Sequence, residues 1–76
     1  MVIKLSQGKE KTNYKVVSVL GADNISIRLK ELGFVKNTNV FIQKFSLANK
    51  SAIVCIRGYF LCIKNNALAK VLVTNA

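Results

Sequence analysis

The 76-residue sequence has no histidine, no proline and no tryptophan, and it has only three acidic residues. Serine residues are present, but no histidine is available to activate one as a nucleophile. The three carboxylates are scattered at Glu10, Asp23 and Glu31, which is not the pattern of a catalytic pair. The four glycines are isolated and form no phosphate-binding loop of the GxxxxGK type. We therefore predict a protein that is not an enzyme and that uses no cofactor.

Long apolar runs are also missing from the sequence. Runs such as AIVCI at 52–56 are far shorter than the ~20 residues that a membrane-spanning helix needs. The stretch 1–11 lacks the apolar core of a signal peptide. We therefore expect a cytoplasmic protein with no membrane span, in which the two cysteines are reduced thiols.

Basic residues dominate the charge: twelve lysines and arginines give a net charge of +9. Such an imbalance favours an anionic partner, which could be nucleic acid, an acidic protein surface or a membrane surface. The alternative is that the charge only keeps a small, apolar domain in solution. Both interpretations stay open at this point, because net charge bears on association and not on fold.

The remaining composition predicts one mainly β domain over residues 1–76. Hydrophobic residues make up 51% of the chain, enough for a dense core. Residues 2–5 are apolar enough to be a first strand or a packed N-terminal arm, and runs rich in β-branched residues predict strands, in order, at 14–20, 39–45, 51–57, 59–64 and 71–74. A polar loop is expected at 6–13 and a single helical turn within 65–70. Five or six short strands in so short a chain predict a small barrel or a curled meander.

The segment 22–33 has the pattern of a short amphipathic helix. Asp23 or Asn24 can cap its amino end, and Gly33 follows its last turn, where a left-handed cap needs glycine. Spacings of four and three place three apolar residues on one face, which we expect to be buried: Ile25, Leu29 and Leu32. The opposite face is expected to carry the charged residues Arg28, Lys30 and Glu31.

Gly58 predicts a tight hairpin between the strands at 51–57 and 59–64. If Gly58 and Tyr59 form the turn, Cys55 faces Cys62 directly, and if Arg57 and Gly58 form it, the two thiols are diagonal neighbours. Both registers put the thiols on one face. Two thiolates could hold part of a zinc or copper(I) site, but no further ligands accompany them. We therefore favour a packing role for both cysteines and predict no metal site. Cys55 and Cys62 are the only candidate metal ligands in the sequence.

The same hairpin predicts an exposed apolar face. Side-chain alternation groups Ile53, Cys55, Arg57, Phe60, Cys62 and Lys64 on one side of it. Because Arg57 and Lys64 favour solvent, we expect this side to face outward. It would then display a candidate surface for self-association or docking: Ile53, Cys55, Phe60 and Cys62. The alternative is that the helix or a chain terminus covers this face.

Nucleic-acid binding is a further hypothesis, because basic residues and strand aromatics together are typical of small RNA-binding barrels. The aromatics on predicted strands are Phe41, Phe45, Tyr59 and Phe60. The lysines, however, are spread along the chain without a cluster, and a small domain needs aromatics for its core. We therefore keep nucleic-acid binding only as an alternative.

The stretch RLKELGFVKNTNV at 28–40 resembles the helix-turn-strand signature of the FeoA family of bacterial ferrous iron transport. The matching positions are Arg28, Leu29, Glu31, Leu32, Gly33, Phe34, Thr38 and Val40. Lys36 and Asn37 replace the usual proline and glycine, and asparagine can still adopt the turn. The flanking stretches KVVSVLG and IRGYFLCIKNNALAKVLV are similar to the family as well, so the resemblance covers most of residues 14–74.

This resemblance implies an SH3-like β-barrel with one inserted helix and no catalytic activity. It implies a regulatory role in ferrous iron uptake through contact with the cytoplasmic GTPase region of the FeoB-type permease. The candidate contact surface is the corner between helix and strand: Arg28, Lys30, Leu32, Gly33, Phe34, Lys36 and Asn37. For Gly33 alone, ending the helix is the preferred role. The alternatives are a nucleic-acid-binding small barrel or a thiol-based metal carrier.

Overall fold

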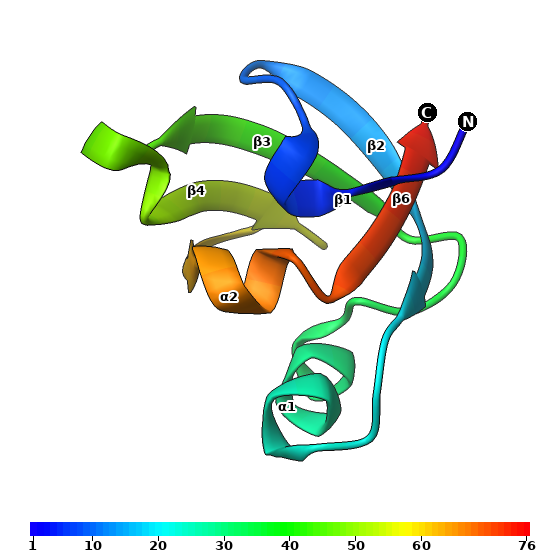
Figure 1. Ribbon diagram of the computed structural model, residues 1–76. Helices are drawn as coiled ribbons and strands as arrows, with labels where there is room; N and C mark the ends of the chain where they lie inside the picture. The colour runs from blue at the N-terminus through cyan, green and yellow to red at the C-terminus, as the bar shows by residue number, and fades with distance from the viewer.

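The computed structural model describes residues 1–76 and has a mainly β fold, which confirms the predicted fold class (Figure 1). Six strands form one antiparallel sheet in the order β1-β6-β2-β3-β4-β5. The strands are β1 (Ile3–Lys4), β2 (Thr12–Val19), β3 (Asn39–Phe45), β4 (Ser51–Ile56), β5 (Tyr59–Lys64) and β6 (Val71–Asn75). The helices are α1 (Asn24–Leu32) and α2 (Asn65–Leu68), and two 3-10 turns are η1 (Leu5–Gln7) and η2 (Leu47–Asn49).

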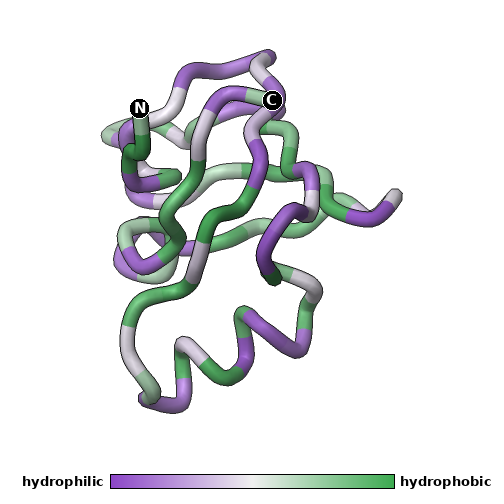
Figure 2. The backbone as a smooth tube through the Cα atoms, turned by 90° about the vertical axis from the view of Figure 1, so that its right-hand side faces the viewer, coloured by the Kyte–Doolittle hydropathy of each residue, from purple (hydrophilic) through white to green (hydrophobic).

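Alternation of apolar and polar residues along the strands builds the core. Figure 2 shows the hydrophobic and hydrophilic residues interspersed along the chain. In β4, for example, Ala52, Val54 and Ile56 are buried while Ile53 is exposed. Leu5 of η1 and Leu68 of α2 are also fully buried. These two short turns therefore cover the core between the edge strands β1 and β5.

The first twelve residues differ most from the predicted elements. The expected strand at 2–5 is reduced to two residues because Leu5 already begins a 3-10 turn. Gly8 then passes so close to β3 that a Cβ atom there would lie 2.6 Å from Ile42 Cδ1. A carboxylate oxygen of Glu10 accepts a hydrogen bond of 2.7 Å from the Phe45 backbone N–H. The loop is thus tied to the sheet, and β2 begins at Thr12, two residues earlier than predicted.

The later predicted strands and the helical turn at 65–68 are confirmed to within a residue or two. Helix α1 is inserted between β2 and β3 and lies at one end of the sheet (Figure 1). Neither helix has the length and apolar character that crossing a bilayer requires.

Candidate partner-binding site

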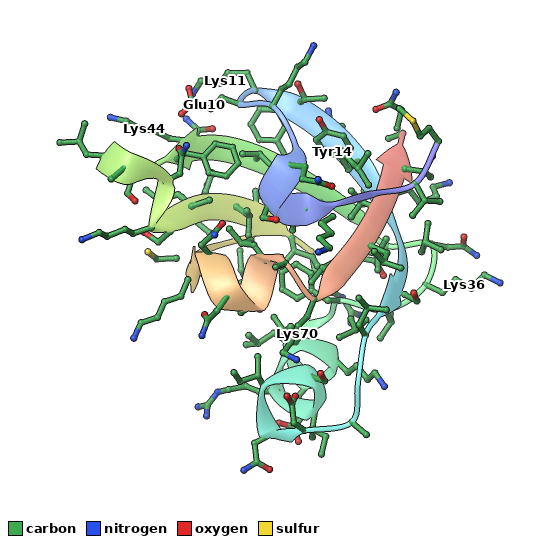
Figure 3. All side chains as sticks on the ribbon, in the orientation of Figure 1. Glu10, Lys11, Tyr14, Lys36, Lys44 and Lys70 are labelled. Atoms are coloured by element: carbon green, nitrogen blue, oxygen red, sulfur yellow. The ribbon has the colours of Figure 1, made fainter.

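Helix α1 is fixed at its amino end by Asp23, as predicted. The Ser26 backbone N–H donates to Asp23 Oδ1 at 2.9 Å, and the ammonium group of Lys70 lies 3.0 Å from Asp23 Oδ2. The backbone hydrogen bond from Ser26, followed by the contact with Lys70, lowers the pKa of Asp23 from 3.8 to about 2. Asp23 therefore stays charged near neutral pH and joins α1 to Lys70, directly before β6. Figure 3 shows Lys70 next to α1.

The buried face of α1 is not the predicted one. Leu29 is buried, but Ile25 and Leu32 are 38% and 39% exposed, and Ser26 is fully buried in their place. The Ser26 hydroxyl donates to the Leu20 carbonyl oxygen at 2.5 Å, which pairs a polar group at the buried position. The face of α1 that packs inward is therefore the one with Ser26 and Leu29. The prediction that all three apolar residues pack inward is wrong for Ile25 and Leu32.

The two cations of α1 also lie apart, although we expected them on one outer face. Arg28 lines a groove together with Ile25 and Leu32. Lys30 lines a separate hollow on the other flank of the helix, beside Lys36 and β2. The two cations lie apart because α1 packs inward through Ser26 and Leu29. This orientation leaves the exposed apolar residues Ile25 and Leu32 next to Arg28.

Helix α1 ends in a Schellman motif, which forms the corner between α1 and the segment that leads to β3. Gly33 has φ +116°, and its N–H donates to the Lys30 carbonyl at 3.1 Å. The Phe34 N–H donates to the Leu29 carbonyl, also at 3.1 Å, and the Phe34 ring is completely buried with Leu29. The predicted glycine cap is therefore confirmed.

This motif corrects the predicted contact surface at two positions. Phe34 is buried in the core, and Gly33 is covered by Arg57, because a Cβ at Gly33 would lie 2.7 Å from Arg57 Cδ. Both residues support the corner from inside and offer no surface to a partner. The other predicted contact residues are exposed: Arg28, Lys30, Leu32, Lys36 and Asn37. Asn37 has φ +72°, as expected for its turn.

The hairpin adopts one of the two registers that the sequence left open. Ile56 pairs with Tyr59, so Arg57 and Gly58 form the turn, with φ values of +53° and +84°. Cys55 consequently pairs with Phe60, and Cys62 lies diagonally from it. The structure contains no cluster of three or more histidine, cysteine or acidic side chains that could hold a metal ion.

The predicted outer face of this hairpin is open to solvent. Phe60 is 66% exposed and Ile53 41%, while Cys62 is exposed and Cys55 half-buried. Tyr59 is also exposed, but it lies on the opposite face of β5 from Phe60, because successive side chains of a strand alternate between its two faces. The two rings therefore do not form one stacking surface of the kind that single-stranded nucleic acid uses.

A groove of about 410 Å³ runs between α1 and β5. Its α1 side carries Ile25, Arg28, Leu29 and Leu32, its β5 side carries Cys62, Ile63 and Lys64, and α2 adds Asn66 and Ala67. Two cations and no carboxylate line it. Sequence reasoning missed this groove, because the position of β5 beside α1 depends on tertiary packing.

The surface as a whole is strongly positive. Lys70 is the only one of the twelve basic side chains that forms an ion pair. Of the three carboxylates, Asp23 is paired with Lys70 and Glu10 accepts from the β3 backbone. Lys11 and Lys44 lie near each other at the upper left of Figure 3, and Lys36 extends outward on the right. The chain can therefore attract acidic surfaces, especially where cations flank apolar side chains.

Comparison with solved structures supports the fold. One crystal structure described as the iron uptake regulatory protein FeoA has a TM-score of 0.87 and 22% identity, covering 100% of this chain and 99% of that one. FeoA of Stenotrophomonas maltophilia, solved with zinc, has a TM-score of 0.83 and 27% identity over 97% of this chain and 89% of that one. It is described as an SH3 domain protein, which agrees with the predicted SH3-like fold.

A similar fold also occurs as part of a longer chain. The IdeR protein of T. acidophilum matches with a TM-score of 0.84 at 13% identity, and the match covers 99% of this chain but 34% of IdeR. No curated protein matches the sequence. The family model described as the FeoA domain matches residues 3–75. Since that match spans nearly the whole sequence and agrees with the resemblance at 28–40, this chain belongs to the FeoA domain family.

Proposed function

We propose that this protein regulates ferrous iron uptake by binding the cytoplasmic GTPase region of a FeoB-type permease. It acts in the cytoplasm and catalyses no reaction of its own. Family membership supports this role, as does the S. maltophilia relative, which is described as a candidate ferrous iron transport activating factor.

The observation that carries the proposal is the corner at the carboxyl end of α1 and in the turn after it, called here the corner surface. It has Arg28 and Leu32 on one flank of the helix, and Lys36, with Asn37 next to it in sequence, on the other. These four side chains are exposed, and Leu32 lies in the groove beside Arg28. The buried Phe34 and the Schellman motif hold the corner rigid beneath them. An exposed leucine beside a cation on one flank, with further unpaired cations on the other, suits an acidic protein partner that contacts both flanks, because the charges orient the encounter and the apolar group adds affinity.

Calorimetric titration with the purified cytoplasmic region of the permease tests the proposal. We expect the wild-type chain to bind and the double variant Arg28→Glu/Lys36→Glu to bind at least about tenfold more weakly. The matched control carries the same two charge reversals at Lys9 and Lys44, which are exposed and lie outside the corner surface. This control should bind within about threefold of the wild type.

Ferrous iron uptake in cells gives the second readout. Cells lacking the protein should recover uptake with the wild type and the control variant but not with the corner variant. Normal uptake without the protein, together with no calorimetric binding, would contradict the proposal.

A further inference from the structure

Strand β5 leaves one side of the sheet without a partner. The sheet order ends at β5, which spans six residues, whereas the other edge strand, β1, spans only two. Exposed edge strands of this length are templates for pairing with another chain, and proteins usually blunt or cover them. The edge of β5 has no proline, and no irregularity of register interrupts its pairing with β4.

The turn determines which backbone groups of β5 face outward. In a two-residue hairpin, the residues that flank the turn exchange both hydrogen bonds, and hydrogen-bonded pairs then alternate along the strands. Ile56 and Tyr59 flank this turn. Leu61 and Ile63 therefore direct their N–H and C=O groups to β4, while Phe60 and Cys62 direct theirs to the free edge. No hydrogen bond outside the strand ladder involves the backbone of Phe60 or Cys62.

The free edge of β5 borders the groove beside α1, since Cys62, Ile63 and Lys64 line that groove. The opposite wall offers Ile25 and Leu32, which α1 leaves more than one third exposed. The groove thus presents unpaired backbone groups on one wall and apolar side chains on the other. Arg28 and Lys64 add positive charge, and no carboxylate lies between them.

We propose that an extended acidic segment of the partner protein adds to β5 as an extra antiparallel or parallel strand and lies in the groove against α1. Its backbone pairs with Phe60 and Cys62, its apolar side chains pack against Ile25 and Leu32, and its carboxylates meet Arg28 and Lys64. A second copy of the chain fits less well, because both copies carry a charge of +9. The inference deepens the proposed function and rests on it for the identity of the partner.

Hydrogen exchange measured by NMR tests the pairing directly. The probe is a blocked octapeptide that alternates glutamate and valine, and the control peptide has lysine in place of glutamate. In the free protein we expect the amides of Phe60 and Cys62 to exchange quickly and those of Leu61 and Ile63 slowly. Saturating acidic peptide should slow exchange at Phe60 and Cys62 by at least about tenfold, and the lysine peptide should not.

Two variants extend the test to affinity. Cys62→Pro removes an N–H that points to the free edge and leaves the ladder to β4 intact. It should bind the peptide at least about tenfold more weakly than Cys62→Ala, which makes the side-chain change but keeps that N–H. Should proline disturb the fold, Arg28→Glu/Lys64→Glu replaces it, with Lys9→Glu/Lys44→Glu as the charge-matched control. The first pair should lose binding and the second should keep it.

Three results would overturn strand addition. These are peptide binding without slower exchange at Phe60 and Cys62, equal binding of the two peptides, or slower exchange that follows protein concentration without peptide, which would indicate self-pairing.

The permease region separates this inference from the proposed function. If that region binds Cys62→Pro and Cys62→Ala equally well, strand addition fails and the proposed function stands. If it binds no form of the chain while the acidic peptide slows exchange at the edge, the proposed function fails and strand addition stands.

Discussion

Replacing Gly33 by alanine tests the corner on which the proposed contact depends. Gly33 has φ +116°, which strains any residue with a Cβ, at a cost of about 1–2 kcal/mol. The new Cβ would also lie 2.7 Å from Arg57 Cδ, so the arginine must leave its rotamer, at a further cost of about 1 kcal/mol. We expect Gly33→Ala to lower the free energy of unfolding by about 2–3 kcal/mol.

That loss is large for a chain of this size. A 76-residue domain has a free energy of unfolding of roughly 4–11 kcal/mol, and each kcal/mol moves Tm by about 4–8 °C. Urea titration and thermal unfolding should therefore both detect Gly33→Ala, with a fall in Tm of about 10–20 °C. The variant should also bind the permease region more weakly, because the corner is less well fixed.

A double-mutant cycle separates the two causes. In an Arg57→Ala background the close approach is absent, so Gly33→Ala should cost about 1 kcal/mol less than in the wild type. Gly58→Ala is the matched control: Gly58 has φ +84°, but a Cβ there would have no neighbour within 4 Å. It should cost only the backbone strain and show no coupling to the corner. Equal costs of Gly33→Ala with and without Arg57 would refute the packing of Arg57 over the glycine.

Three further predictions concern the core and the cap of α1. Phe34→Ala should lower the free energy of unfolding, measured in urea, by about 3–5 kcal/mol, because the ring is fully buried. Phe60→Ala, at a 66% exposed position, should change it by no more than about 0.5 kcal/mol. Similar losses for the two variants would contradict the burial of Phe34. Ser26→Ala leaves the Leu20 carbonyl without its donor and should cost about 1–3 kcal/mol, and a negligible cost would show that this hydrogen bond does not orient α1. The pKa of Asp23 is lowered in the folded state from 3.8 to about 2, so its carboxylate stabilises the fold above about pH 4, and this contribution is lost as the pH falls toward 2. The stability difference between wild type and Asp23→Asn should shrink over that pH range, and a difference independent of pH would exclude the charge of the Asp23 carboxylate as its source.

Local patterns were sufficient for most of the fold. Alternation of apolar residues located the strands from 39 onward, and Asp23 and Gly33 marked the ends of α1 because capping depends on neighbouring residues alone. The hairpin register stayed open, because glycine tolerates either turn position. Only pairing with β4 selects Arg57 for a left-handed conformation that its own residue type does not favour.

The candidate site was harder to predict, because it depends on how α1 rests on the sheet. Helical spacing could not reveal that Ser26 takes the buried position through its bond to Leu20, and so it misplaced Ile25 and Leu32. The burial of Phe34, by contrast, had a usable signal. An apolar residue directly after a glycine cap commonly packs against the last helical turn, as Phe34 does in the core with Leu29.

We propose that the chain acts through the corner surface of α1 and the free edge of β5. Titration of the unlabelled permease region into ¹⁵N-labelled protein, followed by amide chemical shifts, tests it most directly. We expect the shifts to concentrate at residues 28–37 and 60–64, and the loop at 8–11, between η1 and β2, to stay unchanged. Shifts confined to that loop, or no shifts at a saturating concentration of the region, would contradict it.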